Sequence, residues 1–310
     1  MKYTCYLRRT MDLMKKGWFS EKNDLWPGVS LSLEVNEVLY EDKSEFQDIL
    51  VLDTKSKGRT LVLDGIIQCT ENDEFAYQEM ISFLPLNCHP CPKSVLIVGG
   101  GDGGVAREVA KHKSVEKITQ VEIDGKVIEV SKRLLPFMAV GFENKKLALH
   151  VDDGFAFMKN HKNEFDVIIT DSSDPVGPAV CLFEESYFSL MKDALKPNGI
   201  ICSQAGTMWS NMDIVKNTLN NTCKVFPVFD YAFCSVPTYP DGQIGFVLGS
   251  LNQETNFKEP IHKYTDEELE EMKMRYYSTE VHRSAFTLPR FASGALRSLL
   301  NRNTNTKKIN

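Results

Sequence analysis

The hydrophobic pattern changes along the chain and predicts two different parts. Between residues 31 and 70 apolar positions alternate with polar ones, as at Leu31, Leu33 and Val35, and Asp64-Gly65 is a strong turn signal. A period of two is typical of strands with one buried face. We therefore expect a small antiparallel sheet of about four to six strands, which needs a neighbour or a second subunit to complete its core.

From Ser94 onward, unbroken apolar runs such as Val95-Leu96-Ile97-Val98 alternate with stretches of helical period. Such runs suit parallel strands covered on both faces, and their alternation with helices is typical of a doubly wound sheet. Strands are predicted over residues 95–98, 118–123, 147–151, 165–170 and 199–204, followed by a hairpin of 225–236 and 244–248. Helices are predicted over residues 71–84, after 104, and over 126–135, 155–159, 183–195, 212–223 and 265–302, with ends or breaks at Pro85, Pro136 and Pro289.

The predicted fold class is α/β, a Rossmann-like, methyltransferase-type doubly wound sheet with a small N-terminal antiparallel β domain. Three segments are expected: an arm over residues 1–24, the small β domain over 25–72 and the Rossmann-like catalytic domain over 73–310. The arm is expected to be loosely held, because its apolar residues are scattered without a period.

A nucleoside-binding pattern lies between Ser94 and Asp124. Gly99, Gly101 and Gly104 fit the spacing G-x-G-x-x-G between a strand and a helix. Glu122 follows about twenty residues later at the end of the next strand, where a carboxylate can accept both ribose hydroxyls. Glycines let the backbone turn tightly and approach a ligand. The alternative is a glycine-rich turn beside a solvated carboxylate, but this context favours a nucleoside ligand.

Asp102 makes the glycine turn acidic. A dinucleotide would bring its pyrophosphate onto this turn, where a second anion is unfavourable. The acid therefore indicates a ligand without phosphates, and favours an S-adenosyl-sulfonium compound over NAD.

Acidic residues follow four successive strands of the predicted sheet. The carboxyl ends of parallel strands meet at one edge, so these acids would crowd negative charge into one crevice. A cationic ligand would offset that charge; the alternative, a set of solvated turn acids, is common for any single one. The acids at these strand ends are Asp102, Glu122, Asp153, Asp171 and Asp174.

Ligand chemistry suggests different roles for them. Glu122 suits ribose hydroxyls, Asp153 beside Gly154 suits an adenine amino group, and Asp102 suits an ammonium or sulfonium arm. Asp171 and Asp174 remain for a second substrate. A carboxylate pair in a crevice can hold one member with a raised pKa, as a general base requires. The proline-containing loop over 172–179 has the length and stiffness of a lid.

Composition excludes several classes of protein. The 310 residues carry a net charge of −6, which makes nucleic acid an unfavourable partner. No apolar stretch is long enough to span a membrane, and the N-terminus has no secretory signal, so a cytoplasmic protein is expected. The eight cysteines are expected to be reduced. Cys88-His89-Pro90-Cys91 has no second pair at zinc spacing and is interpreted as a structural loop.

Several motifs together resemble the polyamine aminopropyltransferase family, and within it the spermidine synthases. They are GGGDGG (99–104), QVEID (120–124), DGF (153–155), DSSDP (171–175), LVLDGIIQCTENDEFAYQEM (61–80) and PTYPDGQIGF (237–246). The resemblance extends over about residues 26 to 289. It implies a homodimer that transfers the aminopropyl group of decarboxylated S-adenosylmethionine to putrescine, giving spermidine and methylthioadenosine. No metal and no cofactor are implied, because the sulfonium donor is a co-substrate.

The resemblance also implies roles for matching positions. Asp171 matches the general base, Tyr77 and Asp174 match the groups that orient the attacking amine, and Tyr239 matches a residue of the putrescine channel. The positions that match contacts to the nucleoside donor are Gln47, Gln78, Asp102, Glu122, Asp153 and Gly154.

Two departures from the family pattern concern the substrates. Asp152 stands where the family usually has glycine and adds a charge beside the adenine site. Ala205-Gly206 stand where the family often has an acid after Gln204, so an acid expected near the acceptor pocket is missing.

Three other functions remain as alternatives. A putrescine N-methyltransferase would use the same nucleoside, but a methyl donor keeps its carboxylate, which Asp102 disfavours. An NAD-dependent dehydrogenase is opposed by the acidic turn. A non-catalytic polyamine-binding protein would bind the amines without turnover, because fold alone does not decide activity.

Overall fold

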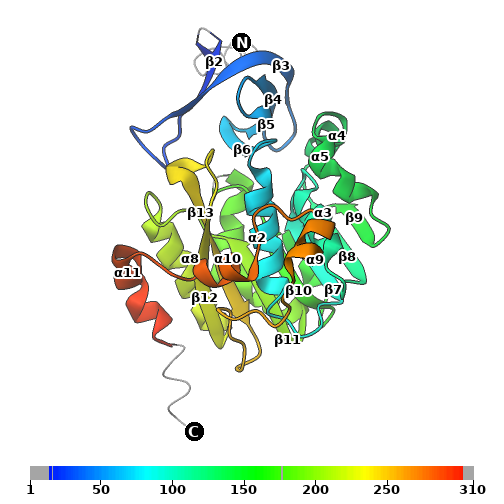
Figure 1. Cartoon of the computed structure of the whole chain (residues 1–310), viewed down its shortest axis with the longest axis vertical. Coiled ribbons are helices and arrows are strands. Elements are labelled where there is room, and N and C mark those ends of the chain that lie inside the picture. Colours follow the sequence, from blue (N-terminus) through cyan, green and yellow to red (C-terminus); the bar gives the residue numbers. More distant parts are fainter. Residues whose placement is uncertain (1–13, 16, 176, 303–310) are drawn as a thin grey trace.

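The computed structural model of the chain describes residues 14–15, 17–175 and 177–302. Two sheets make up the molecule: a smaller N-terminal one, blue to cyan in Figure 1, stands at one end of a larger α/β part. The predicted α/β fold with a small antiparallel domain is confirmed.

The N-terminal sheet is antiparallel throughout, and its six described strands follow the order of the sequence. It has its own small core, in which Phe19, Leu33 and Leu52 are buried. The strands are β1 (Met14–Lys15), β2 (Trp18–Glu21), β3 (Leu31–Lys43), β4 (Asp48–Thr54), β5 (Gly58–Leu63) and β6 (Ile66–Thr70).

The expected arm over residues 1–24 needs correction at its C-terminal end. Strand β2 lies inside this segment and pairs with β3, with Phe19 opposite Leu33. Phe19 is fully buried, so hydrophobic burial holds this part of the chain firmly. Residues 1–13 and 16 of the expected arm lie outside the described residues.

The larger sheet has seven described strands in the order β12-β13-β11-β10-β7-β8-β9, and β13 runs antiparallel to both of its neighbours. The order reverses between β7 and β10, where an open α/β sheet forms its ligand crevice. The strands are β7 (Ser94–Gly99), β8 (Lys117–Glu122), β9 (Leu147–Val151), β10 (Phe165–Asp171), β11 (Leu195–Gln204), β12 (Val228–Ser235) and β13 (Gln243–Ser250).

Helices cover both faces of this sheet (Figure 1). The α-helices are α2 (Glu74–Leu86), α3 (Gly104–Lys111), α4 (Gly125–Leu134), α5 (Pro136–Ala139), α6 (Gly154–Lys159), α7 (Glu185–Ala194), α8 (Met212–Val225), α9 (Asp266–Glu271), α10 (Thr279–Ser284) and α11 (Arg290–Leu300). The 3₁₀ turns are η1 (Val140–Glu143), η2 (Gly177–Phe183) and η3 (Pro240–Gly242).

Helix α2 is the central one, with nearly every side chain buried between the sheet and its neighbours. It continues past Pro85, which the sequence analysis placed at its end. A proline in the last turn removes only one helical hydrogen bond. The N–H of Asn87 donates to the carbonyl of Phe83 at 3.0 Å and completes that turn.

The two sheets are joined by an apolar contact. Ile49, Val51 and Leu61 of the N-terminal sheet pack with Val130 and Met138 of the larger part in one buried cluster. The small sheet thus obtains from its neighbour the burial that its size does not provide.

In the described part of the chain no helix is both long and apolar enough to cross a bilayer. No disulfide joins any of the seven described cysteines; Cys5 lies outside the described residues. The Cys88–Cys91 segment forms the entry to β7, as expected for a structural loop.

Candidate active site

A cavity of about 440 Å³ lies at the carboxyl ends of the central strands, between the larger sheet, α2 and the N-terminal sheet. Every site residue predicted from the sequence lines it. They are Gln47, Tyr77, Gln78, Asp102, Glu122, Asp153, Gly154, Asp171, Asp174 and Tyr239.

The glycine turn after β7 brings the backbone close to the end of β10. Gly99 and Gly100 have φ angles of +87° and +73°, which side chains with a Cβ rarely adopt. A Cβ on Gly99 would also collide with the carbonyl oxygen of Asp171. That carbonyl accepts the N–H of Gly100 at 3.0 Å. The turn therefore fixes the backbone of Asp171.

Asp171 is held by Tyr77, whose hydroxyl donates to its Oδ1 at 2.7 Å. Its Oδ2 has no hydrogen-bond partner among the described residues. Burial raises the pKa of Asp171 to about 8, the charges of Asp102 and Glu122 add to the rise, and the Tyr77 hydrogen bond opposes it. The side chain therefore presents one free oxygen that readily accepts a proton near neutral pH.

Asp102 faces Gln78 across the cavity wall. Its Oδ1 accepts the N–H of Gly104 at 2.7 Å, and the Gln78 amide donates to its Oδ2 at 3.3 Å. Burial raises the pKa of Asp102, while these bonds and the positive charge of Arg107 lower it. The turn that binds an anion in a dinucleotide site thus carries a half-buried carboxyl here.

Glu122 is only 8% exposed and accepts the N–H of Asp124 at 2.8 Å through Oε1. Burial raises the pKa of Glu122 to about 7, and the neighbouring acids Asp124 and Asp102 contribute to the rise.

Sequence analysis missed Asp124 as a site residue. Its Oδ2 accepts the hydroxyl of Ser44 at 2.6 Å and the amide of Gln47 at 2.9 Å, and both donors come from the hairpin between β3 and β4. Asp124 thereby holds Gln47 at the cavity. The only signal in the sequence was a second acid close to Glu122, which the ribose interpretation did not need.

Asp153 is the N-cap of α6, where its Oδ1 accepts the N–H of Phe155 at 2.7 Å. Position 154 requires a glycine, because a Cβ there would lie 2.5 Å from Cγ1 of Val98. Asp152, the additional acid of this segment, is exposed and is not among the described residues that line the cavity.

Asp174 accepts the amide of Gln204 at 3.0 Å through Oδ1, and burial raises its pKa. Gly206 lines the cavity nearby without a side chain to fill it.

Glu21 is an acid behind the lining at this end of the cavity, and no sequence pattern indicated it: its Oε2 accepts the N–H of the lining residue Ile67 at 3.4 Å. It is 2% exposed, and its Oε1 has no partner among the residues that the structure describes. Burial raises the pKa of Glu21 to about 8, and the charge of Asp174 contributes to the rise. The residue lay in a segment without periodicity, so no pattern distinguished it from a surface acid.

Tyr239 closes the cavity from the loop between β12 and β13. Its hydroxyl donates to the carbonyl of Gln68 at 2.6 Å, and its ring meets that of Tyr77 edge to face, with centroids 5.9 Å apart. The two rings thus add apolar surface to the cavity wall next to the residue that holds Asp171.

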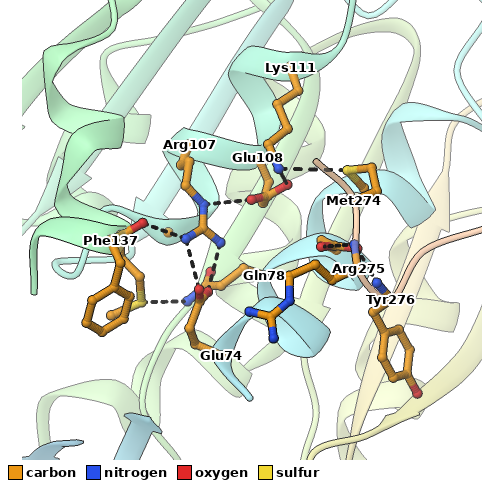
Figure 2. Close-up of polar contacts among 12 residues, drawn as sticks. Glu74, Gln78, Arg107, Glu108, Lys111, Phe137, Met274, Arg275 and Tyr276 are labelled. Atoms are coloured by element: carbon orange, nitrogen blue, oxygen red, sulfur yellow. Dashed lines mark hydrogen bonds and ion pairs between the residues drawn. The ribbon is translucent and has the colours of Figure 1, made fainter. Parts of the chain in front are cut away.

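Behind the cavity, Arg107 of α3 ties three elements together (Figure 2). Its guanidinium donates to both oxygens of Glu74 at 2.9 and 2.8 Å, to Glu108 at 2.7 Å and to the carbonyl of Phe137 at 2.7 Å. Glu74 lies one helical turn before Gln78 on α2. This network fixes α2 against the helix that follows the glycine turn.

These contacts suit cationic ligands. Several carboxyls share one partly closed space, and no lysine or arginine is among the described residues that line it. No group of three or more His, Cys, Asp or Glu side chains that could hold a metal ion occurs in the described ranges.

Comparison with known proteins gives matches over nearly the whole chain. A spermine/spermidine synthase domain matches residues 74–259, and a spermidine synthase tetramerisation domain matches residues 17–71. The spermidine synthase of Dictyostelium discoideum is 55% identical, over 92% of this chain and 99% of that protein. Spermine synthase SPE4 of Saccharomyces cerevisiae is 49% identical, over 90% of this chain and 95% of that protein.

Among solved structures, a spermidine synthase in complex with the transition-state analogue AdoDATO superposes with a TM-score of 0.84 at 33% identity. The match covers 93% of this chain and 99% of that one.

Proposed function

The chain belongs to the spermine/spermidine synthase family, and we propose that it moves the aminopropyl group of decarboxylated S-adenosylmethionine to putrescine, giving spermidine and methylthioadenosine. The observation that carries this proposal is the set of half-buried carboxyls around one cavity, Asp102, Asp171 and Asp174 among them. A sulfonium nucleoside and a diamine would supply the positive charges that these groups lack.

The donor occupies the half of the cavity nearest the glycine turn. Glu122 accepts the ribose hydroxyls, and Asp153 with Gly154 binds the adenine at the start of α6. Asp102 and Gln78 receive the free ammonium of the aminopropyl arm, with Gln47 completing the wall. A donor that kept its carboxylate would set a second anion against Asp102.

The acceptor amine lies between Tyr77, Tyr239 and the two acids of the 171–174 segment. An ammonium has no lone pair, so the reacting nitrogen must lose a proton, which the free Oδ2 of Asp171 can accept. The nitrogen then attacks the aminopropyl carbon that is bonded to the sulfonium sulfur. The carbon–sulfur bond breaks, sulfur keeps the electron pair, and neutral methylthioadenosine leaves. Asp174 orients the reacting amine. The negative charge of nearby Glu21 favours the ammonium at the other end of the diamine.

Displacement at a sulfonium-activated carbon needs positioning rather than an added electrophile, so we propose that no cofactor or metal takes part. We further propose a cytoplasmic homodimer. A family description that names tetramerisation for residues 17–71 supports self-association through the N-terminal sheet.

The decisive experiment separates aminopropyl transfer from methyl transfer. The protein is incubated with putrescine and either decarboxylated S-adenosylmethionine or S-adenosylmethionine, and the products are identified by mass. We expect spermidine and methylthioadenosine from the decarboxylated donor only. N-methylputrescine from the other donor, or no product from either, would refute the proposal. Spermidine as a second acceptor tests for spermine formation.

Asp102→Asn is expected to weaken selection between the two donors. The variant keeps the shape of the side chain but removes the charge that welcomes an ammonium and rejects a carboxylate. We expect KM for the decarboxylated donor to rise about tenfold, the usual effect of losing one charge-assisted hydrogen bond. Steady-state kinetics and competition by S-adenosylmethionine measure this. Asp152→Asn is the control, because that acid does not line the cavity; equal effects in both variants would contradict the role of Asp102.

Glu21→Gln is expected to raise the stability of the protein at pH 8 and to weaken the binding of putrescine. The pKa of Glu21 rises from 4.5 to about 8 on folding. The folded protein therefore keeps a proton that the unfolded chain releases, and this contribution to stability is lost as pH rises from about 4.5 to about 8. The glutamine variant does not ionise, so it should be the more stable protein at pH 8. Its KM for putrescine should rise about threefold, because a nearby negative charge that attracts the ammonium is lost.

Thermal unfolding across this pH range and kinetics at saturating donor measure the two effects. Glu34→Gln, an exposed acid of the same sheet that pairs with Lys55, serves as the control. A Glu21→Gln variant with normal putrescine KM would show that this acid does not face the acceptor.

A further inference from the structure

Asp73 occupies the N-cap position of α2 but does not cap the helix. An aspartate there normally accepts N–H groups of the first helical turn. Here the structure, which describes that whole turn, shows no capping bond from the side chain. Its carboxylate turns instead toward Thr238, in the loop of residues 236–242 that joins β12 to β13.

The contact between Asp73 and Thr238 is buried and fully bonded. The backbone N–H of Thr238 donates to Oδ2 at 3.0 Å, and the Thr238 hydroxyl lies 2.9 Å from both carboxylate oxygens. Thr70 donates to Oδ1 at 2.7 Å. The exposed fractions are 5% for Asp73, 1% for Thr238 and 0% for Thr70. A buried carboxylate with these donors is a firm link between segments far apart in the sequence.

The link determines where Tyr239 lies. Tyr239 follows Thr238 directly and lines the cavity together with Pro240. Its ring stands against Tyr77, which holds Asp171, and its hydroxyl reaches the carbonyl of Gln68. The other end of the loop is held at the surface, where Asp241 accepts from Ser210. The buried Asp73–Thr238 contact is therefore the fixed point of the inner half of the loop.

We propose that the Asp73–Thr238 pair sets the width of the acceptor half of the cavity, and that Thr238 is thereby a positioning residue that determines which amines fit. This inference rests on the proposed function. The donor half is formed by other segments, namely the glycine turn, the end of β8 and the start of α6. The pair should therefore act on the acceptor and leave donor binding alone.

Thr238→Val removes the hydroxyl at nearly constant shape, and Thr238→Ser keeps it. Thr222→Val is the matched control: Thr222 is a fully buried threonine of α8 whose hydroxyl donates to the carbonyl of Thr218 at 2.9 Å. Each variant is assayed with putrescine and with spermidine at saturating decarboxylated donor, and then with the donor varied. Calorimetric titration of putrescine measures acceptor binding without turnover, and thermal unfolding reports stability.

We expect Thr238→Val to raise KM and the dissociation constant for putrescine about tenfold, the loss that one hydrogen bond to a charged group produces. Donor KM should stay within about twofold, discrimination between putrescine and spermidine should fall, and Thr238→Ser should behave as the wild type. Kinetics for Thr222→Val should match the wild type.

The inference is overturned if Thr238→Val changes both KM values together, if it behaves like Thr222→Val, or if serine fails to restore acceptor binding. Absence of aminopropyl transfer by the wild-type protein would instead refute the proposed function. The putrescine titrations of wild type and Thr238→Val would still decide the role of the pair.

Discussion

Replacing Asp171 with asparagine should lower kcat at least about 100-fold, the low end of what a positioned general base contributes. The amide keeps the size of the carboxyl and can still accept the Tyr77 hydroxyl, but it cannot take a proton from the amine. Folding and donor binding should persist, because the glycine turn donates its hydrogen bond to the backbone carbonyl of Asp171 and not to its side chain.

The pH dependence provides an independent test. The pKa of Asp171 is raised to about 8, and only the deprotonated carboxyl can act as a base, so wild-type kcat/KM should fall as pH drops below about 8. The residual activity of Asp171→Asn should follow the titration of the amine substrate alone. Asp193→Asn is a control, since Asp193 pairs with Lys162 at the surface. Near-normal turnover by Asp171→Asn would exclude this residue as the base.

Replacing Arg107 with methionine should lower the free energy of unfolding by about 3–5 kcal/mol, the usual cost of removing one partner of a buried ion pair. Glu74 and Glu108 are 5% and 1% exposed and would lose the guanidinium that they share (Figure 2). The pKa of Glu74 is already raised by burial, with Arg107 opposing that rise. Without Arg107, Glu74 must take up a proton or remain as an unpaired charge.

Chemical denaturation at pH 7 measures this loss. Arg283→Met is a matched control, because Arg283 also binds both oxygens of one glutamate, Glu259, but at the surface. An exposed pair of this kind contributes little to stability, because solvent screens both charges. Adding Glu74→Gln to Arg107→Met should recover part of the stability. Equal losses at positions 107 and 283 would show that burial of the network has little influence.

The sequence predicted the elements that depend on local patterns. The apolar run before Gly99, the glycine turn and Glu122 at the end of β8 are read from neighbouring residues, and the structure places them as expected. A contact between the two sheets was also predictable, because a small sheet needs a partner. The residues that form this contact were not predictable, since periodicity does not say which faces meet.

Contacts between distant segments escaped prediction. Glu21 had no periodic surroundings, and its position near Asp174 depends on how the first strands fold over the cavity. No pattern in the sequence distinguished Asp73, and only the tertiary structure shows its carboxylate on Thr238. Pro85 was predicted to end the helix because proline has a low helix propensity. In the structure, packing extends α2 to Leu86.

The hairpin between β3 and β4 has a consequence for how such a chain can be built. Ser44 and Gln47 reach from it to Asp124, and Gln47 forms part of the cavity wall. The small N-terminal sheet is thus no independent attachment to the larger part, because it supplies one side of the cavity. A larger part without this hairpin would lose Gln47 from the cavity wall and both side-chain donors to Oδ2 of Asp124.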